Sequence, residues 1–226
     1  MEIADNLAAV QARVASAACA CGRDPLEITV LAVSKTFDQT AVRAAALSGQ
    51  RDFGENYLQE ALDKQIAVAD PALIWHFIGP IQSNKTRGIA ENFSWAHSLD
   101  RLKIAERLSA QRPITAPPMN ICIEVNISGE GSKSGVRPPA LAAFADQIAA
   151  LPQLRLRGLM AIPAPTPDVV RQRAAFGQVR ELFDALNARG FNLDTLSMGM
   201  SADLEAAIAE GATLIRVGTA IFGSRL

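Results

Sequence analysis

The sequence has no excess of basic residues and few aromatic residues. Lysines and arginines number 22 against 23 aspartates and glutamates, so the formal net charge is −1 at pH 7. Aromatic residues make up only 5% of the chain. Nucleic-acid binders need basic surfaces for the phosphates and, for single strands, aromatic rings for the bases. The composition therefore argues against a nucleic-acid partner.

Long hydrophobic runs and a leader segment are also lacking. The longest apolar runs, such as residues 28–33, are far shorter than the roughly 20 residues of a membrane-spanning helix. Glu2 and Asp5 stand near the N-terminus, where a secretory signal carries positive charge. We therefore expect a mature cytoplasmic protein with no membrane partner.

Cysteine and histidine are scarce as well. The three cysteines, Cys19, Cys21 and Cys122, are an odd number with no second pair for a zinc site, so we expect reduced, partly buried thiols. The two histidines, His76 and His97, are too far apart in sequence for a helix-borne metal pair. We expect both to be buried and hydrogen-bonded, and we predict no metal site.

The chain does contain a regular alternation of short apolar runs and helical segments. Between the apolar runs, apolar residues recur at helical spacing, as in residues 176–186. Strands that are apolar on both faces and alternate with helices form parallel sheets. The predicted strands span residues 27–33, 51–54, 73–79, 93–98, 119–126, 154–162, 195–199 and 213–218.

Eight such units in about 200 residues match a small (β/α)8 barrel of the TIM type. A doubly wound open sheet is the alternative. A further helix is predicted at residues 2–20, before the first strand, and no linker-like segment divides the chain. We therefore predict an α/β fold, with a single barrel domain over residues 1–226 and an extra N-terminal helix.

Polar residues and glycines gather after the predicted strands, where barrel enzymes carry their chemistry. Lys35 directly follows the first strand, which is strongly apolar. An apolar wall favours the neutral amine, and a neutral amine can form a Schiff base with a carbonyl compound. A solvated lysine that closes the strand is the alternative.

Phosphate-binding features follow the last two predicted strands. Ser201 precedes a predicted helix at a position that suits an N-cap, and Gly218 and Thr219 open the last turn. Amides at helix starts and nearby hydroxyls bind phosphate, and barrels commonly hold phosphate after strands seven and eight. Ser201 as a simple cap is the alternative. With Lys35, these residues predict a site for a phosphorylated carbonyl compound, either pyridoxal 5′-phosphate (PLP) or the substrate of a Schiff-base aldolase.

Arg216 is predicted near the end of the eighth strand, beside this site. If the ligand is PLP, the permanently charged guanidinium lies near its ring. An arginine donates to an unprotonated pyridine nitrogen, which makes the ring a weaker electron sink than an acidic partner does. An arginine paired with an acid at the barrel rim is the alternative.

Long segments of the sequence resemble the YggS/PROSC family of pyridoxal phosphate homeostasis proteins. They follow the family's order over nearly the whole chain. The segments are LAVSKTF (31–37), DFGENYLQE (52–60), WHFIGPIQSNKTR (75–87), HSLD (97–100), EVNISGEGSKSGV (124–136), GLMAIP (158–163), LSMGMSADLEAAIAEGAT (196–213) and IRVGTAIFGSR (215–225). The resemblance implies a barrel similar to the N-terminal domain of alanine racemase, which binds PLP and serves vitamin B6 homeostasis without catalytic turnover.

The resemblance also assigns eight residues to the cofactor site. Lys35 corresponds to the Schiff-base lysine, and Arg216 to the arginine near the pyridine nitrogen. The implied phosphate donors are Ser201, Gly218 and Thr219, and the other implied lining residues are Asn56, Met198 and Gly199. Lys133 falls at the position of an active-site arginine of the racemases, and its role stays open.

The resemblance to racemases is incomplete at the catalytic groups. The chain stops soon after the eighth predicted strand, so we expect the racemases' second domain and its tyrosine base to be missing. Racemisation by two bases needs an acid or base on each face of the α-carbon. We therefore expect a monomeric, non-enzymatic PLP protein whose candidate partners are apo-forms of PLP enzymes. A PLP-dependent enzyme such as an amino-acid racemase is the first alternative, and a Schiff-base aldolase is the second.

Overall fold

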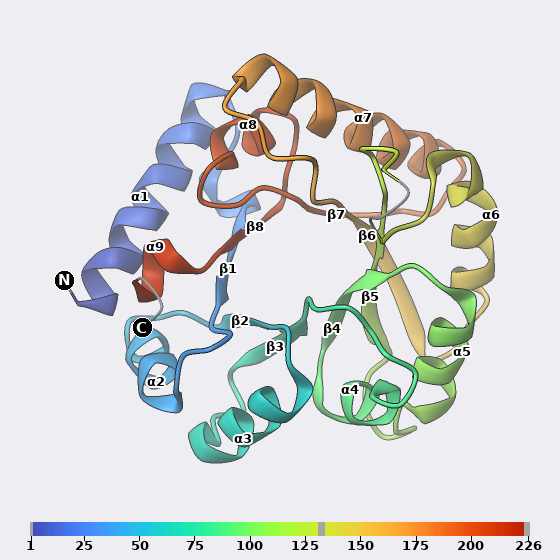
Figure 1. Ribbon diagram of the computed structural model, residues 1–226, viewed down its shortest axis with the longest axis horizontal. Helices are drawn as coiled ribbons and strands as arrows, with labels where there is room; N and C mark the ends of the chain where they lie inside the picture. The colour runs from blue at the N-terminus through green and yellow to red at the C-terminus, as the bar shows by residue number, and fades with distance from the viewer. Residues whose placement is uncertain (1, 131–133, 224–226) are drawn as a thin grey trace.

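The computed structural model describes residues 2–130 and 134–223. Within them, parallel strands β1 to β8 pair in sequence order, and β8 pairs with β1, so the sheet closes into a barrel (Figure 1). The strands are β1 (Thr29–Val33), β2 (Asp52–Glu55), β3 (Ile74–Phe77), β4 (Trp95–Leu99), β5 (Met119–Glu124), β6 (Leu154–Met160), β7 (Thr195–Ser197) and β8 (Leu214–Val217). The predicted barrel is confirmed, and the open sheet is excluded.

Helices surround the barrel and cover its outer face (Figure 1). The extra N-terminal helix, α1, packs outside the barrel against α8 and α9. The helices are α1 (Ile3–Ala20), α2 (Gln39–Leu47), α3 (Leu58–Val68), α4 (Thr86–Asn92), α5 (Leu102–Gln111), α6 (Pro138–Ala149), α7 (Val169–Ala188), α8 (Leu204–Ala209) and α9 (Thr219–Phe222), with a short 3-10 helix at Pro25–Glu27.

The core forms because each strand is covered on both faces. Leu31 and Ala32 of β1 are both fully buried, one on each face of the strand. On α1, Leu7, Val10 and Val14 recur at i, i+3 and i+7 and join the same core. The apolar runs of the sequence are therefore strands buried between the barrel interior and the helices.

Some predicted details are wrong. The first strand begins at Thr29 and not at residue 27, because the side chain of Asp24 accepts a hydrogen bond from the Leu26 N–H and stabilises the 3-10 turn before the strand.

Of the cysteines expected to be partly buried, Cys19 and Cys21 are exposed and Cys122 is buried. Burial raises the pKa of the Cys122 thiol to about 12.

A chain of hydrogen bonds runs through the barrel interior. Arg216 Nη1 donates to Ser197 Oγ at 2.9 Å, and this oxygen lies 2.8 Å from His97 Nδ1. His97 Nε2 lies 2.9 Å from His76 Nδ1, and His76 Nε2 lies 3.0 Å from Asp52 Oδ1. Both histidines are buried, so the expectation of buried, hydrogen-bonded histidines is confirmed.

The groups at the two ends of this series of hydrogen bonds, Arg216 and Asp52, set the donor and the acceptor in every one of them. A guanidinium can only donate a hydrogen bond, and a carboxylate can only accept one. Each imidazole therefore carries its proton on Nε2, so that Ser197 donates to His97, His97 to His76, and His76 to Asp52. Burial lowers the pKa of His76, and burial together with the charges of its neighbours lowers the pKa of His97 well below its usual value. Both shifts favour the neutral imidazoles that the chain requires.

Across residues 2–130 and 134–223, no helix combines the length and the hydropathy needed to cross a membrane. The same residues contain no group of three or more His, Cys, Asp or Glu side chains placed to hold a metal ion.

The close approach of β6 and β7 gives a first prediction. A Cβ added at Gly158 would lie 1.7 Å from the carbonyl oxygen of Thr195, so the backbone would have to move. We predict that Gly158→Ala lowers the free energy of unfolding by about 3 kcal/mol or more, measured by urea denaturation. The control is Gly177→Ala in α7, where the new Cβ would meet only the Glu210 carboxylate, 3.4 Å away. Because alanine has the higher helix propensity, Gly177→Ala should raise the free energy of unfolding by at most about 1 kcal/mol. Equal effects of the two substitutions on the free energy of unfolding would contradict the packing argument.

The interior hydrogen-bond chain gives a second prediction. We expect His76 and His97 to be neutral and protonated on Nε2 at pH 7, as read from ¹⁵N-resolved NMR of the imidazoles, with His76→Gln assigning the signals. Because both pKa values are lowered in the folded protein, the unfolded chain binds more protons below about pH 6.5. The stability that these histidines contribute is thus present above that pH and lost as the pH falls. A proton on Nδ1 of either imidazole would contradict the donor and acceptor roles assigned to the hydrogen bonds from Ser197 to Asp52.

Candidate functional site

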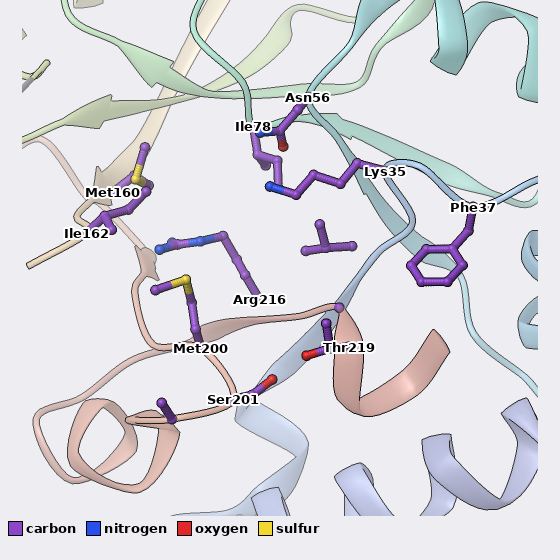
Figure 2. A pocket seen from close by; sticks show the side chains of 13 residues that line it. Lys35, Phe37, Asn56, Ile78, Met160, Ile162, Met200, Ser201, Arg216 and Thr219 are labelled. Atoms are coloured by element: carbon purple, nitrogen blue, oxygen red, sulfur yellow. The ribbon is translucent and has the colours of Figure 1, made fainter. Parts of the chain in front are cut away.

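A cavity of about 320 Å³ opens at the carboxyl end of the barrel (Figure 2). Its walls come from the ends of β1, β6 and β8 and from the loops that follow β2, β3 and β7. The lining residues are Val33, Lys35, Phe37, Asn56, Ile78, Met160, Ile162, Met200, Ser201, Ala202, Arg216, Gly218 and Thr219. The volume suits a small phosphorylated ligand.

The structure brings six of the eight residues assigned from the sequence to this cavity: Lys35, Asn56, Ser201, Arg216, Gly218 and Thr219. Met198 and Gly199 are not among the lining residues. Met198 is fully buried. Gly199 has a φ of 94°, and a Cβ there would lie 2.5 Å from that of Ala207, so this glycine allows the loop to pack on α8. Lys133 lies outside the described residues.

One end of the cavity is rich in hydrogen-bond donors. The side chains of Ser201 and Thr219 lie at the same end (Figure 2). Gly218 is the N-cap of α9, whose first amides have no acceptor within the helix. Two hydroxyls beside a helix start form a surface that suits a phosphate group.

Ser201 is not the N-cap that the sequence predicted. Helix α8 begins at Leu204, and Asp203 occupies the cap position. Residues 200–203 form a turn in which the Met200 N–H donates to Asp203 Oδ1 at 2.7 Å. This turn places Ser201 at the cavity wall, before the helix and not at its start.

The extra N-terminal helix supports the same end of the cavity. Arg13 of α1 donates to the carbonyl oxygen of Ser201 at 2.8 Å and pairs with Glu205 of α8 at 2.5 Å. The carboxylate raises the pKa of Arg13. Helix α1 thus ties the Ser201 loop to the outside of the barrel.

Arg216 lies on β8 and is 5% exposed. Its guanidinium donates to the carbonyl oxygen and hydroxyl of Ser197, at 2.5 and 2.9 Å, and to the carbonyl oxygen of Ala161 at 3.0 Å. These three acceptors are uncharged, so the predicted alternative of an arginine paired with an acid at the rim is wrong. Burial lowers the pKa of Arg216 to about 10, which leaves the side chain charged at neutral pH.

The side chain of Lys35 extends from the end of β1 into the cavity, beside Asn56 and Ile78 (Figure 2). Asn56 Oδ1 is buried and has no hydrogen-bond partner within the described part of the chain. A buried acceptor without a donor is costly, so a ligand with a donor group would satisfy it.

The electrostatics of the cavity favour an anion. Lys35 and Arg216 are basic, and the described lining residues include no aspartate or glutamate. A partly enclosed site with one sign of charge concentrates ligands of the opposite sign.

Sequence reasoning missed the apolar wall and a neighbouring acid. Phe37, Met160 and Met200 line the cavity, and their places at or just after strand ends are the signal that could have revealed them. Glu124, the last residue of β5, lines a smaller cavity of about 200 Å³ that shares Ile162 with the first. Burial raises the pKa of Glu124 to about 7.

Comparisons with known proteins place the chain in a family. Residues 5–226 match the family model of the alanine racemase N-terminal domain. The pyridoxal phosphate homeostasis protein of Pseudomonas aeruginosa is 63% identical over 223 residues, covering 99% of this chain and 96% of the relative. That of Escherichia coli strain K12 is 53% identical over 229 residues, covering 99% and 97%.

The fold of this chain is also similar to that of a solved structure. PipY of Synechococcus elongatus, in a structure with PLP bound, has a TM-score of 0.84 and 37% sequence identity. The match covers 98% of this chain and 100% of PipY. The chain therefore belongs to the family of pyridoxal phosphate homeostasis proteins, which carry the alanine racemase N-terminal fold.

Proposed function

We propose that this protein binds PLP in the cavity at the carboxyl end of its barrel and serves PLP homeostasis. The observation that carries the proposal is a single cavity that gathers a lysine amine, a buried arginine and a donor-rich end. The names of the relatives and the PLP-bound PipY structure support it. The unpartnered oxygen of Asn56 supports it further, because it offers an acceptor to the bound group.

Each group has a role in this proposal. Ser201, Gly218 and Thr219 hold the phosphate, and Lys35 Nζ supplies the amine for a Schiff-base link to the cofactor. When bound, PLP supplies an electrophilic aldehyde and an electron-withdrawing ring. Arg216 donates a hydrogen bond toward the ring nitrogen.

The proposal includes the absence of catalytic turnover. With a pKa of about 10, Arg216 keeps its proton at neutral pH and acts as a hydrogen-bond donor. Apart from Lys35, the described residues that line the cavity include no carboxylate, histidine, tyrosine or cysteine to act as a second base. Delivery of PLP to apo-forms of PLP enzymes, a monomeric state and a cytoplasmic location belong to the same proposal.

The Schiff-base link can be tested by trapping. After incubation with PLP and reduction with borohydride, we expect the intact mass of the wild type to rise by one reduced cofactor, on the peptide that contains Lys35. Lys35→Ala should show no such increase, because the amine is gone. Lys103→Ala, at an exposed lysine of α5, is the matched control and should trap like the wild type. Equal trapping by Lys35→Ala and the wild type would overturn the assignment.

Turnover can be tested by isotope exchange. We predict that the PLP-loaded protein does not exchange the α-hydrogen of alanine or other amino acids with D₂O above the level of Lys35→Ala, because a ring nitrogen that accepts a hydrogen bond from Arg216 leaves the ring a weak electron sink. Proton NMR follows the α-hydrogen. Exchange that depends on Lys35 would favour the racemase alternative, and trapping of dihydroxyacetone phosphate in preference to PLP would favour the aldolase.

A further inference from the structure

A buried ionic cluster lies next to the segment that carries Lys35. Lys64 of α3 is 4% exposed, yet its Nζ lies 2.7 Å from Glu55 Oε1 and 2.5 Å from Glu60 Oε1. Glu55, the last residue of β2, is fully buried, and burial raises the pKa of its carboxyl group. Lys64 and the two glutamates do not line the cavity. Buried ion pairs are weak evidence for stability, because desolvation offsets their attraction.

The cluster binds the backbone on both sides of Lys35. Lys64 Nζ donates to the carbonyl oxygen of Ser34 at 2.7 Å, and Ser34 Oγ donates to Glu55 Oε1 at 2.6 Å. The N–H of Thr36 donates to Glu60 Oε1 at 2.5 Å. Residues 34 and 36 are therefore both tied to the cluster, and Lys35 lies between them.

The backbone at Thr36 has an unusual conformation. Its φ is 71°, in the left-handed region, which a residue with a branched β-carbon rarely adopts. Such a conformation persists only where its surroundings hold it in place. The hydrogen bond from the Thr36 N–H to Glu60, which Lys64 in turn binds, is a direct means of holding it.

We propose that Lys64 and Glu60 are positioning residues that keep Thr36 left-handed and thereby aim the Lys35 amine into the cavity. The inference rests on the proposed function, since it concerns the amine that links PLP. It also gives a reason why three ionisable side chains lie together at this point of the barrel, although their desolvation costs free energy. If the cluster were only structural, replacing Lys64 by an apolar side chain of similar length would leave the reactivity of Lys35 unchanged.

The test compares covalent linking with non-covalent binding. Linking is followed as the rate constant of borohydride-trappable PLP incorporation. Non-covalent binding is measured with 4′-deoxypyridoxine 5′-phosphate, which keeps the ring and phosphate but lacks the aldehyde. For Lys64→Met we expect the rate constant to fall about tenfold or more, because the amine is misplaced, while the affinity for the analogue changes by less than about twofold. Lys103→Met, the same change at an exposed position of α5, should alter neither value.

A second substitution tests the role of Thr36. Glycine adopts the left-handed region without steric cost, so Lys64→Met combined with Thr36→Gly should restore most of the lost rate. An unchanged rate in Lys64→Met, or a loss that Thr36→Gly does not restore, would overturn the inference. If Lys64→Met fails to fold, Glu60→Ala, which removes the acceptor of the Thr36 N–H, undergoes the same comparison and must show the same loss and rescue. Failure of the wild type to bind the analogue would instead count against the proposed function.

Discussion

A buried arginine without an acidic contact is the constraint on which the interior of this barrel depends. The guanidinium of Arg216 starts a chain of hydrogen bonds that runs through Ser197, His97 and His76 to the carboxylate of Asp52. These five residues come from β8, β7, β4, β3 and β2, so the chain of hydrogen bonds exists only when the sheet closes in this register. Fold and site are therefore coupled, because the closure that buries the apolar core also supplies the partners of the cavity's buried cation.

The two basic side chains of the cavity are supported by polar networks of different kinds. Arg216 is held directly, through its own hydrogen bonds. The segment around Lys35 is held through its backbone, since Lys64 binds Ser34 and Glu60 binds Thr36. Hydrogen bonds with fixed directions restrain orientation more narrowly than apolar packing does. In the proposed function this matters, because an amine and a ring-nitrogen donor must both face one small ligand.

The sequence was sufficient to predict the barrel and much of the cavity, because both follow from strand order. Eight apolar runs alternate with helices, and residues just after the runs, such as Lys35 and Thr219, must meet at one end of a parallel barrel. The predicted positions that differ from the structure depend on loop geometry. Ser201 lies before α8 and not at its N-cap, and the side chain of Met198 is buried in the core. Lys64 was not predictable, since a lysine on an amphipathic helix ordinarily faces solvent, and only the packing of α3 against the end of β1 buries it.

If the protein binds PLP as proposed, the same arrangement gives a reason why the site would hold this reactive aldehyde without transforming it. Capture needs an anchored phosphate and an aimed amine, and the donor-rich end and the Lys35 segment provide both in the proposed function. Racemisation of an amino acid by two bases needs in addition an electron sink and a base on each face of the α-carbon. Arg216 keeps its proton at neutral pH, so in the proposed function it donates to the ring nitrogen and does not strengthen the electron sink. Across the cavity from Lys35 lie Arg216 and the side chains of Met160, Ile162 and Met200 (Figure 2), and the methionine and isoleucine side chains transfer no protons. In the proposed function, the described lining therefore supplies groups for binding and, apart from Lys35, no group that transfers a proton, which is the combination that a reversible holder of PLP requires.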